Sequence, residues 1–155
     1  MNDEGGRDMH GWALNIEELT NANTNFLEVV HTGEYSQLTI MSLEPGDDIG
    51  THQHRNIDQL VRVESGSARA TLGSKRDRME ETHELESGWA AFIPAGAWHN
   101  IINTGSVALK LQLVHSPAKR WRDDVYATRA EAIAADLEMD REVTFGMAGA
   151  AGFGA

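Results

Sequence analysis

The middle of this 155-residue chain is built from short apolar runs that alternate with stretches rich in glycine, proline, asparagine and aspartate. Such runs are typical of β-strands, and the residues between them supply the positive or fixed φ angles that tight turns require. Many short strands joined by regular turns predict an all-β sandwich or barrel. We expect the strands at residues 26–32, 35–44, 58–65, 67–73, 89–94, 98–103 and 107–115.

Three segments outside these strands need separate interpretation. Residues 73–84 are too polar for a core strand, so we expect a long hairpin with solvated charges and a surface position for His83. The run WALNIEELT at residues 12–20 permits either a strand or one helical turn. Residues 128–140 begin with a threonine that can cap a helix and place a glutamate three residues later, which predicts a short C-terminal helix.

The length and composition fit one compact domain, with 41% apolar and 24% charged residues. The expected division is an N-terminal extension at residues 1–25, a barrel at 26–118, a helical segment at 119–140 and a Gly/Ala-rich tail at 141–155. The tail carries too little apolar bulk to fold alone, which leaves disorder or packing on a partner.

The chain is strongly acidic, with 13 basic and 24 acidic residues and a formal net charge of -11. This charge repels phosphate backbones and anionic lipid surfaces, so neither nucleic acid nor a membrane is an expected partner. The first residues, MNDEGGRDMH, are polar and acidic where a signal peptide would be basic and then apolar. A cytoplasmic location is therefore the default expectation.

Histidine is the centre of any expected metal chemistry, because the chain has no cysteine to supply disulfides or thiolate ligands. His52 and His54 are two residues apart, so on a strand both side chains leave the same face and can share one ion. Gln59 follows on a face that should point inward. His99 begins a later strand, where it could meet the first pair. Three imidazoles from two strands would form a half-shell with open positions for water or substrate.

These two segments resemble the paired motifs of the cupin superfamily. The first pattern, G-x5-H-x-H-x4-E-x6-G, is matched by Gly46, His52, His54 and Gly66, with Gln59 where glutamate is usual. The second pattern, G-x5-P-x-G-x2-H-x3-N, is matched in full by Gly88, Pro94, Gly96, His99 and Asn103. Two spaced motifs in the right order are far more specific than either alone, and the resemblance covers roughly residues 35 to 118.

The resemblance implies a double-stranded β-helix, or jelly-roll barrel, with a metal ion in its bore and usually a homodimer. The implied ligands are His52, His54 and His99, with Gln59 as the fourth. Manganese, iron, nickel and zinc are all candidates for the one divalent ion. The amino-acid sequences of both segments are similar to those of small cupins labelled mannose-6-phosphate-isomerase-like. This label says little about the substrate.

Gln59 is the departure from the pattern with the largest consequence. A glutamate ligand would cancel part of the ion's charge, whereas an amide oxygen is neutral and leaves the full double charge on the metal. Such a site should bind its metal less tightly, act as a stronger Lewis acid and favour carboxylates or enolates. Some small cupins that act on unsaturated uronates are similar in using glutamine here. Alternatively, Gln59 hydrogen-bonds a metal-bound water, and Asp58 is a rival ligand that strand parity would point outward.

Other residues are candidates for contact with a substrate. His115 shares one face of the last core strand with three leucines and could act as a general acid or base, although a satisfied or rim histidine is the commoner case. Gln37, Met41 and Val61 are the expected substrate-binding residues on inward faces. Side chains of opposite parity or large aromatic type are assigned to the surface, to barrel packing or to a dimer contact: Arg62, Arg69, Trp89, Phe92 and Trp98.

Three functions remain open at this level. The first is a metal-dependent enzyme that isomerises, epimerises or eliminates from a small polar, carboxylated molecule. The second is a dioxygenase or oxidase that uses iron or manganese, which the missing carboxylate ligand disfavours. The third is a non-catalytic protein that binds a small ligand.

Overall fold

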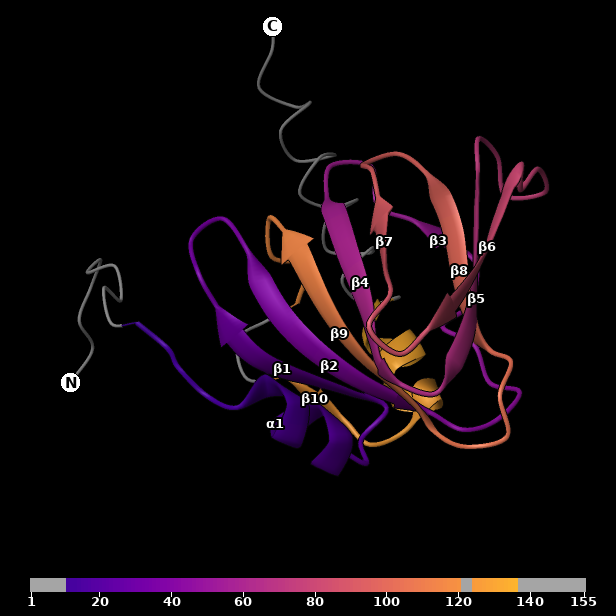
Figure 1. The fold of residues 1–155 in the computed structure, drawn as a ribbon. Coiled ribbons are helices and arrows are strands. Elements are labelled where there is room, and N and C mark those ends of the chain that lie inside the picture. Colours follow the sequence, from indigo (N-terminus) through magenta and orange to yellow (C-terminus); the bar gives the residue numbers. More distant parts are fainter. Residues whose placement is uncertain (1–10, 121–123, 137–155) are drawn as a thin grey trace, which may run out of the picture.

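Two antiparallel sheets face each other in the computed structural model, which describes residues 11–120 and 124–136 (Figure 1). The larger sheet has the order β10-β1-β2-β9-β4-β7, and the smaller sheet has the order β3-β8-β5-β6. The strands are β1 (Leu27–Thr32), β2 (Gln37–Leu43), β3 (His52–Gln53), β4 (Asp58–Ser65), β5 (Ser67–Gly73), β6 (Glu81–Glu86), β7 (Ala90–Ile93), β8 (Trp98–Asn103), β9 (Leu109–Ser116) and β10 (Val125–Tyr126). This arrangement is the predicted all-β jelly roll.

The core lies between the sheets and follows the alternation of the strands. On β4, Val61 and Val63 are fully buried, whereas Leu60 faces outward and is 41% exposed. Gly66 joins β4 to β5 with a φ of 97°, and a Cβ atom there would lie 3.1 Å from the Cα of Leu109. The turn therefore combines a backbone conformation suited to glycine with a close approach of β9.

The seven predicted strands are present within about two residues of their expected bounds. The polar segment after residue 73 forms the expected hairpin excursion, but its return half is a regular edge strand, β6, in which Leu85 is the buried side chain. His83 is on the surface as expected, with its Nε2 3.1 Å from a carboxylate oxygen of Glu81. The two-residue strand β10 was not anticipated.

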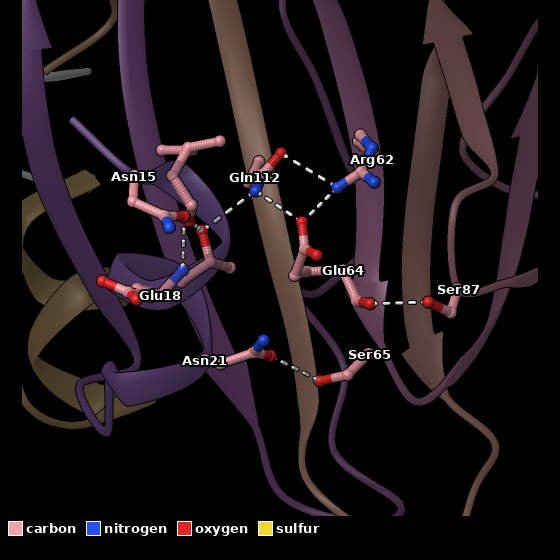
Figure 2. A network of polar contacts seen from close by, with 10 residues as sticks. Asn15, Glu18, Asn21, Arg62, Glu64, Ser65, Ser87 and Gln112 are labelled. Carbon is pink, nitrogen blue, oxygen red and sulfur yellow. Dashed lines mark hydrogen bonds and ion pairs between the residues drawn. The ribbon is translucent and has the colours of Figure 1, made fainter. Parts of the chain in front are cut away.

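The segment near the N-terminus for which the sequence permits a strand or a helical turn contains a helix, α1 (Ile16–Ala22). This helix covers the outer face of the larger sheet. Asn15 caps it by accepting a hydrogen bond from the backbone N–H of Glu18 at 3.1 Å. Beneath it, Gln112 donates to Thr20 Oγ1 at 3.1 Å and to the Glu64 carboxylate at 2.8 Å. Figure 2 shows that Arg62 joins this network through Glu64 and Gln112, so its charge is paired on the outer face.

Residues 129–136 form the described part of the C-terminal helix. Thr128 Oγ1 accepts from the N–H of Glu131 at 3.3 Å, and the Glu131 carboxylate accepts from the N–H of Ala127 at 2.9 Å. The predicted capping pair is thus confirmed, while residues 137–140 and the tail lie outside the described residues. Ala132 packs into the barrel core, so this helix is docked on the barrel. Within the described part of the chain, neither helix has the length and apolar character of a membrane span.

Two aromatic side chains that were expected in barrel packing or a dimer contact lie on the surface. Trp89 is 58% exposed and Phe92 is 60% exposed, and Phe92 pairs across the strands with Leu60. Packing inside the barrel is therefore excluded for these two aromatics. The homodimer stays a prediction.

Asn103 on β8 is buried, and its side chain connects the two sheets through hydrogen bonds, which gives a prediction about stability. Its Nδ2 donates to the carbonyls of Leu43 and Val107, each at 2.9 Å, and its Oδ1 accepts from the N–H of Gly105 at 2.9 Å. Asn103→Ala should lower the free energy of unfolding by about 3 kcal/mol, because it leaves backbone groups without partners. Denaturant unfolding measures this loss. Asn21→Ala, which removes one exposed hydrogen bond to Ser65, is the control, and equal losses in both variants would contradict the argument.

Candidate metal centre

Both sheets contribute polar side chains to one region of the barrel. His52 on β3 is the direct cross-strand partner of His99 on β8 in the smaller sheet, and His54 follows β3 by one residue. Gln59 enters from β4 in the larger sheet. The ligand atoms of His52, His54 and His99 all lie within 4.8 Å of one another, so these three residues could hold one metal ion.

A turn at residues 94–97 ties the two histidine segments together. Gly96 has a φ of 90°, a conformation that other residues adopt with strain. Its N–H donates to the carbonyl of His54 at 2.8 Å, and its own carbonyl accepts from Gln53 Nε2 at 2.8 Å. The glycine of the second motif therefore binds the backbone of the first motif and sets where His99 starts its strand.

Two backbone carbonyls orient the imidazole rings. His52 Nδ1 lies 2.6 Å from the carbonyl of Gly50, and His99 Nδ1 lies 3.0 Å from the carbonyl of Ala97. Since a carbonyl only accepts hydrogen bonds, we assign the proton of each ring to Nδ1, which leaves both Nε2 atoms as lone-pair donors. This second contact of a ligating histidine is a common feature of metal sites.

Electrostatics keep all three histidines neutral near pH 7. Burial, and after it the electrostatic effects of His99 and Lys119, lower the pKa of His52 to about 3. Burial also lowers the pKa of His54 and of His99 below the usual value. A neutral imidazole is the form that binds a metal, so protons do not compete with an ion at neutral pH.

Unsatisfied buried atoms supply the test of whether the residues fit a metal. His99 Nε2 and Gln59 Oε1 are buried and have no hydrogen-bond partner among the described residues, and the Nε2 atoms of His52 and His54 are 3.1 Å apart. Lone pairs crowded in this way are expected where a cation belongs. Three imidazole nitrogens and an amide oxygen suit a first-row divalent ion. The metal's identity and direct ligation by Gln59 stay predictions.

Asp58, the rival ligand, lies outside this cluster. It is exposed, and its carboxylate accepts from the backbone N–H of Ala95 at 2.8 Å. It therefore holds the turn from the outer side of the barrel, as strand parity indicated.

A small cavity of about 30 Å³ adjoins the histidines. By the usual requirement of about 10–15 Å³ per water, it has room for roughly two water molecules. Among the expected substrate-binding residues, Met41 lines it, whereas Gln37 and Val61 do not. The described residues that form its wall are Phe26, Leu27, Met41, Ile49, His52, His54, Gln59, Leu113, His115, Lys119, Arg120, Ala132, Ile133 and Asp136.

The amide of Gln37 is occupied by the chain itself. Its Oε1 accepts from the N–H of Arg120 at 2.9 Å, and its Nε2 donates to the carbonyl of Arg120 at 2.7 Å and to Thr32 Oγ1 at 3.0 Å. Val61 is a fully buried core residue. Gln37 and Val61 therefore lie behind the residues that line the cavity. Their contact with a substrate stays a prediction.

His115 lies in the cavity wall as part of a polar row. It pairs across the strands with Gln37 on one side and with Gln59 on the other. It is 4% exposed, and its Nδ1 has no partner among the described residues. Burial, and then the charges of Lys119 and Arg120, lower its pKa to about 3. Near pH 7 it is a neutral imidazole, and its role as a general acid or base stays a prediction.

Sequence reasoning missed the residues that follow the last core strand. Lys119, Arg120, Ile133 and Asp136 all line the cavity, although they belong to the segment that was set apart from the barrel. Two adjacent basic residues, three and four positions after the end of β9 in an acidic chain, were the available signal. The sequence did not indicate that these four residues line the cavity, because this depends on how the C-terminal segment packs on the barrel.

The comparisons with known proteins agree with this fold and site. The family model described as a cupin domain matches residues 39–115. "Uncharacterized protein YrkC" of Bacillus subtilis (strain 168) is 37% identical over 125 residues, which cover 81% of this chain and 67% of that protein. "Uncharacterized protein L612" of Acanthamoeba polyphaga mimivirus is 39% identical over 108 residues, which cover 69% of this chain and 66% of that protein. The matched part thus spans about two thirds of both relatives.

A solved structure supports the same assignment. The crystal structure of BH2720 from Bacillus halodurans superposes with a TM-score of 0.79 at 37% identity, and the match covers 87% of this chain and 100% of that chain. The names of these three proteins state no activity. They support the fold and the family, while the chemistry has to be argued from the site.

Removal of two histidines should abolish metal binding. We expect the protein, purified without chelators or a nickel column, to carry about one divalent ion per chain, and His52→Ala/His54→Ala to carry almost none, because three of the ligand atoms converge on one point. Elemental analysis measures the content. His83→Ala, which changes an exposed histidine, is the control and should keep its metal. Equal metal content in all three proteins would refute the ligand assignment.

Acid should destabilise the metal-free protein partly through His115. Its pKa is about 3 in the folded protein against 6.5 as the ordinary value, so unfolding takes up a proton between these limits. This contribution to stability is complete above pH 6.5 and is lost as the pH falls toward 3. Between about pH 5.5 and about pH 4, His115→Gln should lose about 1.4 kcal/mol less per pH unit than the unchanged protein. Urea unfolding of chelator-treated protein tests this, and parallel pH profiles would contradict it.

Proposed function

This chain belongs to the cupin family, and from that premise we propose that it is a metal-dependent enzyme that acts on a small polar molecule carrying a carboxylate. The observation that carries the proposal is the donor set. His52, His54 and Gln59 line one cavity, and the ligand atom of His99 lies within 4.8 Å of those of His52 and His54, so none of the four candidate ligands is a carboxylate. Isomerisation, epimerisation or β-elimination are the reaction types that fit.

The charge balance of the cavity favours an anionic ligand. Neutral donors leave the full charge of a divalent ion in place, and Lys119 and Arg120 add positive charge to the same wall. Asp136 is the one acidic residue among the described residues that line it. In a site of low dielectric, such an excess of positive charge attracts a carboxylate and stabilises an enolate.

The chain's own residues divide the remaining tasks. A bound divalent ion would supply Lewis acidity to a carbonyl oxygen and to the enolate that forms from it. His52 and His99 hold their lone pairs in position through their carbonyl contacts, and Phe26, Leu27 and Leu113 form an apolar wall that limits water. His115 is the candidate proton carrier, because an anionic substrate beside it would raise its pKa toward neutrality.

Turnover under anaerobic conditions tests the proposal. Protein loaded with manganese, iron, nickel or zinc should convert at least one member of a panel of keto acids, hydroxy acids and uronates, with the product followed by NMR. Chelator-treated protein and His52→Ala/His54→Ala should be inactive. Gln59→Glu should bind carboxylates more weakly, because the added charge cancels part of the positive charge of the site.

Two outcomes would contradict the proposal. Substrate-dependent oxygen uptake by the iron or manganese form, with no anaerobic turnover, would identify a dioxygenase or oxidase. Tight binding of a compound with no turnover in any metal form would identify a binding protein. A homodimer and a cytoplasmic location complete the proposal, and size-exclusion chromatography with light scattering tests the first of these.

A further inference from the structure

Arg120 is a buried cation whose hydrogen-bonding groups are only partly satisfied. Its side chain is 6% exposed, and its Nη2 lies 3.0 Å from Asp136 Oδ1. Its Nε and Nη1 are buried and have no hydrogen-bond partner among the described residues. A guanidinium group offers five N–H donors in a planar fork that matches a carboxylate. Buried donors left without acceptors are costly, so this fork lacks an acceptor that the site should receive.

The structure holds Arg120 in the cavity wall. The side-chain amide of Gln37 forms two hydrogen bonds with the backbone of Arg120. It accepts from the Arg120 N–H at 2.9 Å and donates to the Arg120 carbonyl at 2.7 Å. The guanidinium carbon lies 5.3 Å from the centre of the Tyr126 ring, which suits a cation–π contact. These contacts fix the main chain and one face of the side chain, while the same side chain lines the cavity beside His52 and Gln59. Arg120 is therefore prearranged beside the candidate metal ligands.

Asp136 is the group that now pairs with this cation. It belongs to the C-terminal helix, its side chain is 32% exposed, and its Oδ1 also lies 3.5 Å from Lys119 Nζ. It lines the inner cavity and also a larger outer cavity of about 690 Å³ that shares His52, Ile49 and Ile133 with it. The carboxylate of Asp136 thus stands between the metal site and the wider space outside.

We propose that Arg120 binds the carboxylate of a metal-bound substrate, and that the carboxylate of Asp136 occupies Arg120 until the substrate replaces it. The inference rests on the proposed function, because it assigns the substrate class of the same metal site. The cavity of about 30 Å³ holds roughly two waters, so an incoming carboxylate takes the volume that Asp136 vacates. The substrate class is a small carboxylic acid with a second oxygen beside its carboxylate, which faces the histidines while the carboxylate faces Arg120.

A carboxylate is favoured over a phosphate as the occupant. The group that fills the position in this structure is itself a carboxylate, and the adjoining space is small. A guanidinium fork binds either anion, so inorganic phosphate has to be one arm of the test.

Binding of oxalate to the zinc-loaded full-length protein, measured by isothermal titration calorimetry, tests the proposal. Arg120→Gln should weaken oxalate binding at least about tenfold, because it removes a charged partner from a buried pair. Arg120→Lys should recover only part of the affinity, since an ammonium lacks the planar fork. Asp136→Asn should strengthen oxalate binding by about tenfold, because the competing charge is gone. Arg69→Gln, which removes an arginine from an exposed ion pair with Glu84, is the matched control and should bind normally.

The outcomes separate this inference from the proposed function. Failure of the unchanged protein to bind zinc would remove the metal site and with it the proposed function. Normal zinc content with equal oxalate affinity in the unchanged protein and Arg120→Gln would overturn the role of Arg120 alone. A gain of affinity in Asp136→Asn cannot come from misfolding, and its absence would overturn the role of Asp136. Binding of phosphate that depends on Arg120, without binding of oxalate, would overturn the carboxylate class.

Discussion

The pairing of β3 with β8 is the interaction on which the candidate metal centre depends. It sets His52 directly opposite His99, although the two belong to segments far apart in the chain. A strand of two residues forms few ladder hydrogen bonds, so the pairing needs support. The turn around Gly96 supplies it through its contacts with His54 and Gln53. The carbonyls of Gly50 and Ala97 then orient the rings of His52 and His99 within this pairing.

A row of polar side chains across three strands of the larger sheet gives the barrel interior its chemical character. Gln37, His115 and Gln59 are cross-strand neighbours on β2, β9 and β4. Gln37 is satisfied by Arg120 and Thr32, whereas Gln59 Oε1 and His115 Nδ1 lack partners among the described residues. Gln37 therefore holds the C-terminal segment on the barrel, whereas Gln59 and His115 have polar atoms that an ion or a ligand can bind. Binding there would stabilise the fold, because it satisfies groups whose burial is unfavourable.

Much of the barrel was predictable because its signals are local. Alternation places every second residue of a strand on one face, so the inward position of Gln59 and the outward position of Asp58 followed from parity. The sequence does not decide α1, although Asn15 and two acidic residues mark its start, since a short amphipathic segment can also pair as a strand. The strand β10 gave no signal because two residues form a strand only when a neighbour is already in place.

The sequence by itself predicted the class of the fold and the group of three histidines, because strand patterns are local and the two histidine segments resemble the paired cupin motifs. The role of Gln59 as a ligand stays a prediction. Only the tertiary structure decided what closes the site. Arg120 and Asp136 are separated in the chain from the motifs, and they meet the metal ligands because Gln37 and the docked helix bring them there. No local pattern encodes that meeting, since it depends on contacts between elements that are remote in sequence.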